Sequence, residues 1–159
     1  MSCIVSILTA ESPASPMVAR DAVRAVPGQG LEGDRYFTGT GTFSPLPMKP
    51  DFELTLIESE HIEAFARATG LPFTAADARR NLVTRGVDLN ALAGAEFMIG
   101  EVRVRGIRLC EPCNYLAKIT YPETLRGLVH KGGLRAQILT PGTLRPGDTV
   151  TAIPSGSAQ

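Results

Sequence analysis

Residues 101–116 have the sequence EVRVRGIRLCEPCNYL, and the interpretation of the whole chain depends on this stretch. Its first half alternates valine with arginine, which is typical of a half-buried β-strand. After Gly106 the apolar positions shift by one residue, and such a shift predicts a β-bulge at the glycine. We expect the bulge to turn Arg108 and Cys110 together away from the core.

The second half of this stretch predicts a helix that begins at Pro112, because proline is favoured at the first helical position. Cys113 would then lie in the first turn, where free N–H groups and the helix dipole favour a negative charge. Arg108 acts in the same direction, so the thiolate of Cys113 should be favoured. The thiolate is the form of cysteine that attacks sulfur and binds metals.

Short apolar or alternating segments separated by turn residues predict a fold that is mainly β. We expect about seven to nine short strands with three or four short helices, because helices do not alternate one-for-one with strands. A barrel-like fold with peripheral helices fits this pattern better than a βαβ fold. Residues 1–154 are expected to form a single domain, followed by a flexible tail at 155–159. A glycine- and proline-rich loop at 38–50 is a candidate lid.

The chain has 159 residues and a formal net charge of zero, so its composition gives no reason to expect binding to nucleic acid. No apolar stretch approaches the length of a membrane-spanning helix. No basic residue precedes Arg20, so we expect no cleaved signal peptide and a cytoplasmic location. Three cysteines make no disulfide framework, and reduced thiols agree with that location. The oligomeric state stays open.

Cys110 and Cys113 have the spacing of a redox or metal-binding pair, but the sequence holds no second pair for a zinc site. A thioredoxin-like role would need a βαβ context that the pattern lacks. The alternative is that both cysteines are small buried apolar residues, the usual role of free cysteine. The polar surroundings of Arg108 and Glu111 favour a functional thiol.

Two further segments contain arginines that are candidate anion ligands. Arg80 lies in a basic run that fits either a solvated edge or an anion pocket, since guanidinium groups bind phosphate well. Arg35 lies in a glycine-rich loop, and there an ion pair with a neighbouring acid inside a tight turn is the simpler interpretation.

Together, several short motifs resemble a stand-alone MOSC domain, the domain found at the C-terminus of molybdenum cofactor sulfurases. The likeness extends from about residue 17 to residue 150, and the order and spacing of the motifs carry it. The motifs are Gly33-Asp34-Arg35, Arg80-Asn81, Gly94 with Phe97 and Gly100, Pro112-Cys113-x-x-Leu116, Gly132-Gly133-Leu134-Arg135, and Gly142 with Gly147-Asp148.

This resemblance implies a barrel-like MOSC fold and binding of the molybdenum cofactor, a molybdopterin that carries a phosphate. It also implies a cysteine that carries sulfur or ligates molybdenum, and Cys113 matches that position, with Cys110 as second choice. Arg35, Arg80, Asn81 and Arg108 are then the candidates for binding the pterin and its phosphate.

Three functions follow as alternatives. The first is a sulfur carrier that transfers a Cys113 persulfide during assembly of a metal–sulfur centre. Its donor would be a partner cysteine desulfurase, because this short chain has no room for the pyridoxal phosphate domain of full sulfurases. The second is a molybdenum-dependent reductase of N-hydroxylated substrates with Cys113 as metal ligand. The third is a non-catalytic cofactor-binding module.

Overall fold

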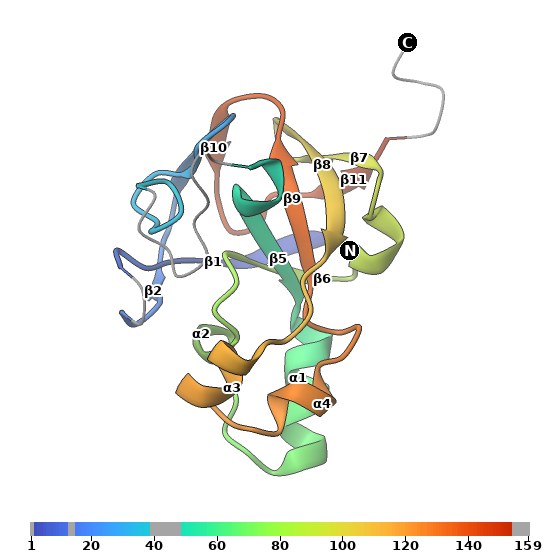
Figure 1. Ribbon diagram of the computed structural model, residues 1–159. Helices are drawn as coiled ribbons and strands as arrows, with labels where there is room; N and C mark the ends of the chain where they lie inside the picture. The colour runs from blue at the N-terminus through green and yellow to red at the C-terminus, as the bar shows by residue number, and fades with distance from the viewer. Residues whose placement is uncertain (1, 13–14, 39–48, 154–159) are drawn as a thin grey trace.

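The computed structural model describes residues 2–12, 15–38 and 49–153, and within them the chain forms eleven strands and four α-helices. Eight strands make one curled sheet, and three make a second, smaller sheet (Figure 1). The large sheet contains, in spatial order, β11 (Val150–Ala152), β7 (Glu96–Ile99), β8 (Val102–Leu109), β9 (Leu134–Ile138), β5 (Leu54–Glu58), β6 (Leu82–Arg85), β1 (Cys3–Thr9) and β2 (Val18–Ala19). The small sheet contains β10 (Gly142–Leu144), β3 (Val23–Val26) and β4 (Gly30–Leu31).

The predicted mainly β, barrel-like fold is confirmed, although the described residues contain more strands than expected. The additional strands include β2, β4 and β10, which have only two or three residues each and leave no periodic pattern in the sequence. The predicted lid at 38–50 falls largely on residues 39–48, and these and the predicted tail at 155–159 lie outside the described residues.

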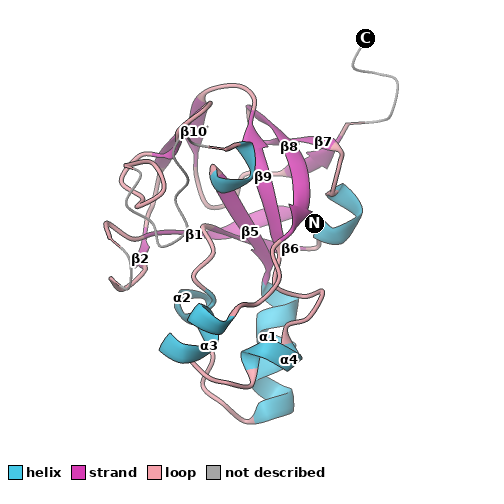
Figure 2. Cartoon of the chain, in the orientation of Figure 1, coloured by secondary structure: helices cyan, strands magenta, loops and turns pink. Residues whose placement is uncertain are grey.

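The four α-helices gather at one end of the large sheet (Figure 2). They are α1 (Ser59–Thr69), α2 (Ala75–Ala78), α3 (Asn114–Ile119) and α4 (Thr124–Gly127). The helix α1 ends at Gly70, which has the positive φ of 72° that glycine tolerates best. A capping box of Thr74 and Asp77 opens α2. No helix in the described part of the chain is long and apolar enough to cross a membrane.

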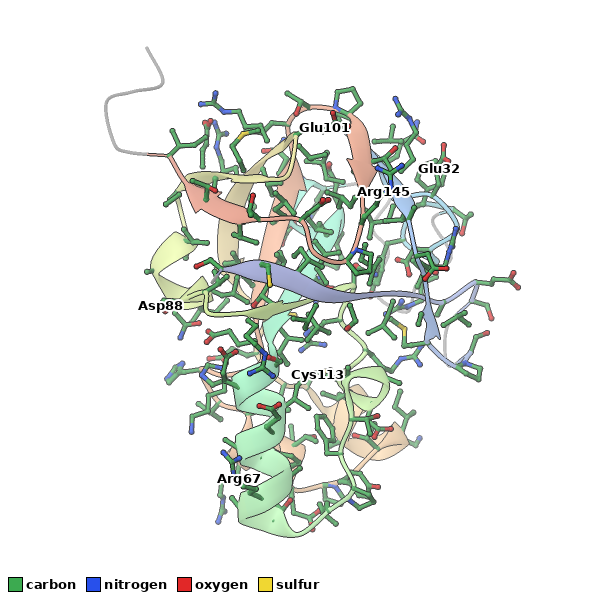
Figure 3. The ribbon with its side chains drawn as sticks, turned by 180° about the vertical axis from the view of Figure 1, so that it is seen from behind. Glu32, Arg67, Asp88, Glu101, Cys113 and Arg145 are labelled. Carbon is green, nitrogen blue, oxygen red and sulfur yellow. The ribbon has the colours of Figure 1, made fainter. Side chains whose placement is uncertain are left out.

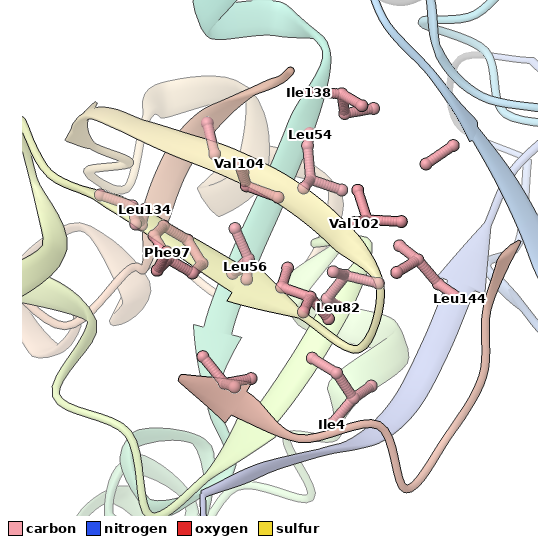
Figure 4. Packing of buried hydrophobic residues seen from close by; sticks show 14 of the residues in the cluster. Ile4, Leu54, Leu56, Leu82, Phe97, Val102, Val104, Leu134, Ile138 and Leu144 are labelled. Carbon is pink, nitrogen blue, oxygen red and sulfur yellow. The ribbon is translucent and has the colours of Figure 1, made fainter. Parts of the chain in front are cut away.

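The strands β5 and β6 carry apolar side chains into two separate cores, because both of their faces are covered. Leu56 and Leu82 point into the core enclosed by the curled sheet (Figure 4). Ile57 and Val83, the next residues along each strand, pack into a second core against the helices. These two strands are parallel and are joined through α1 and α2. The chain therefore contains one βαβ-like crossover within an otherwise antiparallel sheet, and the sequence pattern did not indicate it.

The predicted β-bulge is confirmed, since the register between β8 and β9 shifts between Gly106 and Arg108. A side chain at Gly106 would overlap the backbone carbonyl of Leu92, so this position requires glycine. Beyond the shift, Arg108 and Cys110 both reach the same cavity, as the phase change predicted.

Candidate functional site

A cavity of about 270 Å³ lies where the large sheet meets the helices and the loop that contains Arg35. Five of the six residues predicted from the sequence line it, and Asn81 does not. The lining residues are Arg35, Tyr36, Phe52, Thr55, Arg79, Arg80, Arg108, Cys110, Glu111, Cys113, Leu116 and Arg135.

Both cysteines of the motif reach this cavity, but their surroundings differ. Cys110 is only 2% exposed, and its backbone N–H donates to the carbonyl of Gly133 at 2.8 Å. Cys113 is half-buried between the sheet and the helices (Figure 3). Both are free thiols. Cys113 is therefore the more accessible of the two.

The prediction that Cys113 lies in the first helical turn is wrong by one residue. Cys113 has an extended backbone with φ of −133° and ψ of 168°, so α3 begins at Asn114 and Cys113 is its N-cap. Proline at 112 consequently precedes the helix instead of opening it. The thiol remains in the cavity at the N-terminus of α3, where its side chain makes no capping hydrogen bond.

Arg80 connects three backbone segments around the cavity. Its Nε donates to the carbonyl of Gly132 at 2.9 Å, and its two terminal nitrogens donate to those of Ala78 and Cys110 at 3.1 and 3.3 Å. These acceptors are neutral, so they do not cancel the charge of the guanidinium. Arg80 therefore lines the cavity, whereas Arg85 of the same basic run pairs with Glu63 on the surface.

Arg35 forms the ion pair with Asp34 that the sequence predicted, at 3.1 Å between Nη1 and Oδ1. Both residues are buried, and Asp34 also accepts a hydrogen bond from the backbone of Ala10. The Arg35 guanidinium lies 4.9 Å from the centre of the Tyr36 ring. Buried and held in this way, Arg35 has a fixed position at the cavity wall, and the Asp34 carboxylate offsets part of its charge.

Asn81 has a different environment from the other predicted residues. It is 3% exposed, and its side chain bonds to Thr55 and to the carbonyl of Leu8. It ties together neighbouring strands behind the cavity, and its amide has no direct access to a ligand there. Nothing in the Arg-Asn pair itself distinguishes this structural position from a binding one.

The sequence reasoning missed several lining residues, most clearly Arg135, Phe52 and Arg79. Arg135 belongs to one of the quoted motifs, Gly132-Gly133-Leu134-Arg135, and could have been counted as a candidate anion ligand. Phe52 precedes β5 and left no signal. Among the described residues, no three His, Cys, Asp or Glu side chains gather as a metal site.

A family model described as the MOSC domain matches residues 43–151 of the chain. The chain belongs to the MOSC domain family. This match covers most of the range over which the sequence motifs suggested the likeness. Residues 1–42 precede the match, but β1 pairs with β6 in the same sheet and is part of the same fold.

Several solved structures share the fold of this chain. The YuaD protein from Bacillus subtilis has a TM-score of 0.78 and 18% identity, with 96% of each chain covered. YiiM from Geobacillus stearothermophilus has a TM-score of 0.75 and 19% identity, over 99% of this chain and 78% of its own. YiiM from Escherichia coli has a TM-score of 0.68 and 19% identity, over 99% of this chain and 72% of its own. At such identities the shared property is the fold. No curated protein matches the chain in sequence.

Proposed function

We propose that this MOSC protein binds the molybdenum cofactor in the arginine-lined cavity and carries sulfur on Cys113. The observation that supports it is the convergence of five arginines and two thiols on one cavity of about 270 Å³. The cofactor, when bound, supplies a molybdenum centre with its own sulfur ligands and a phosphate group. The chain supplies complementary charge, since arginine is well suited to phosphate.

The chemistry of the lining residues fits such an anionic group. The hydrogen bonds of Arg80 go to neutral carbonyls, so its charge is available to a ligand. The Nε of Arg135 is buried and has no hydrogen-bond partner among the described residues. A buried donor without a partner is costly, and a ligand oxygen would satisfy it. Cys113 and Cys110 add the soft sulfur atoms that molybdenum or a transferred sulfur would require.

Sulfur transfer to Cys113 needs no external oxidant. The Cys113 thiolate attacks the terminal sulfur of a donor persulfide, the donor's S–S bond breaks, and a new S–S bond forms on Cys113. The donor leaves as a thiolate, so one S–S bond replaces another. Cys113 is preferred over Cys110 as the acceptor because Cys110 is almost fully buried. A partner desulfurase that contains pyridoxal phosphate is the proposed donor.

A second function uses the same residues, with Cys113 as a metal ligand in a reductase of N-hydroxylated substrates. The half-buried position of Cys113 in a positively charged cavity favours it as a candidate. The two functions differ in what Cys113 holds: a persulfide in the first, and the metal in the second. A cofactor-binding module without either role is the remaining alternative.

Sulfur loading distinguishes these functions. Purified protein is treated with a persulfide donor, and bound sulfur is located by peptide mass spectrometry. Variants Cys113→Ser and Cys110→Ser are compared with Cys3→Ser, which lies on β1 away from the cavity lining. We expect one added sulfur atom per chain on Cys113, lost only in Cys113→Ser. Sulfur spread equally over all three cysteines, or absent from Cys113, would contradict the carrier function.

A further inference from the structure

Two arginines stand directly opposite each other at the end of β8 and β9. After the bulge, Arg108 is the register partner of Arg135, and both side chains line the cavity. Like charges at directly opposed positions in a sheet repel each other and destabilise the pair. An anion close to both guanidinium groups would relieve this repulsion.

Asp51 provides such an anion within the chain. It lies in the short 3-10 helix η1 (Pro50–Phe52), and its Oδ2 accepts a hydrogen bond from Arg108 Nε at 2.9 Å. Its backbone carbonyl oxygen lies 3.4 Å from Arg135 Nη1. The next residue, Phe52, places its ring 4.8 Å from the Arg135 guanidinium carbon. The two arginines are thus held from the same side by one short segment.

These contacts leave donors of both arginines unused. Arg135 Nε is buried without a hydrogen-bond partner in the described part of the chain. Arg108 is bonded to one carboxylate oxygen through Nε, and its side chain is 52% exposed. A guanidinium has five N–H donors in a planar fork, so the pair has capacity for a group with several oxygens.

We propose that Arg108 and Arg135 form an oxyanion subsite for a phosphate monoester, and that the Asp51 carboxylate is a tethered competitor that the phosphate displaces from Arg108. A phosphate has more charge and more acceptor oxygens than a carboxylate, so it can satisfy both guanidinium groups together. Whether the phosphate belongs to the molybdenum cofactor rests on the proposed function. The subsite itself does not depend on the metal or on Cys113.

Titration with inorganic phosphate tests the subsite, because this probe contains neither a metal nor a pterin. Binding is measured by isothermal titration calorimetry at low ionic strength, with chloride as the competing salt. The variants are Asp51→Asn, Arg135→Gln and Arg108→Gln. Arg105→Gln is the matched control, since Arg105 is on the same strand, is 47% exposed, and pairs with Glu96 instead.

The two classes of variant should change affinity in opposite directions. Asp51→Asn removes the competitor and should tighten phosphate binding about threefold to tenfold. Arg108→Gln and Arg135→Gln should each weaken it by about tenfold, and Arg105→Gln should leave it unchanged. Circular dichroism confirms the folding of each variant, and the exposed Arg108 provides a second test if Arg135→Gln does not fold.

Two outcomes would overturn this inference. If neither Arg108→Gln nor Arg135→Gln changes the affinity for phosphate, no subsite exists at this pair. Weaker binding in Asp51→Asn would show that Asp51 only positions the arginines and does not compete. Molybdenum and pterin content are measured separately on the same variants. If the arginine variants bind phosphate like wild type but the protein contains the cofactor, the proposed function stands without the subsite. If the subsite binds phosphate but the protein contains no cofactor, only the subsite stands.

Discussion

Replacing Asn81 by alanine should destabilise the protein strongly, because its buried amide joins three segments of backbone. Oδ1 accepts hydrogen bonds from the backbone N–H and the hydroxyl of Thr55 at 3.3 and 3.1 Å. Nδ2 donates to the carbonyl of Leu8 at 3.1 Å. Each bond contributes about 1 kcal/mol, so we expect a loss of about 3 kcal/mol in the free energy of unfolding. For a chain of this size that corresponds to a fall in Tm of roughly 6–12 °C.

Urea denaturation followed by circular dichroism measures this loss, with Asn90→Ala as the control. Asn90 is exposed and makes one bond, from Nδ2 to the carbonyl of His130 at 2.9 Å, so its removal should cost less than about 0.5 kcal/mol. Equal unfolding free energies for the two variants would refute the structural function of Asn81. Normal stability of Asn81→Ala with loss of bound cofactor would instead assign Asn81 to ligand binding.

Three further predictions concern the backbone, the pH dependence and the thiols. Gly133→Ala should prevent folding or greatly reduce expression, because φ is 106° and the new methyl would overlap the carbonyl oxygen of Leu56; a stable, soluble variant would contradict this. Burial raises the pKa of Glu53. Its carboxylate accepts hydrogen bonds from two backbone N–H groups, which lower the pKa, but burial has the larger effect. The folded state then binds this proton more tightly than the unfolded state, so the contribution of Glu53 to stability falls as pH rises from its ordinary pKa through the raised one. Glu53→Gln should therefore gain stability relative to wild type over this pH range in parallel denaturation curves, and a constant difference at every pH would oppose the reasoning. Residues 110–113 contain no turn or bend that would bring the two cysteines together, so mild oxidation should form no disulfide between Cys110 and Cys113. Peptide mapping under non-reducing conditions would disprove this by finding the linked pair.

Local signals in the sequence were reliable where the structure depends on local geometry. The alternation of apolar and polar residues shifts by one position after Gly106, and this shift predicted the bulge. Gly70, which ends α1, and the Thr74–Asp77 pair, which opens α2, are local signals of the same kind. The ion pair of Arg35 with its neighbour was also a local property.

The rest of the site depends on contacts between distant segments, which one sequence does not reveal. Arg135 reaches the cavity because β9 pairs with β8, and Phe52 because η1 packs beside that strand pair. Asn81 resembles a cofactor ligand in sequence, but the pairing of β1, β5 and β6 encloses it. The first residue of α3 also differed from prediction, because Cys113 keeps an extended backbone.

The most direct test of the central claim is the molybdenum and pterin content of protein purified from a molybdate-replete host that makes the cofactor. Wild type, Cys113→Ser and the control Cys3→Ser are measured together by elemental analysis and pterin fluorescence. We predict molybdenum and pterin in near-equal amounts in wild type, Cys3→Ser and Cys113→Ser, because the carrier function places a persulfide, not the metal, on Cys113. Loss of metal from Cys113→Ser alone would contradict the carrier function and favour the reductase. Absence of both from all three proteins would contradict cofactor binding in this cavity.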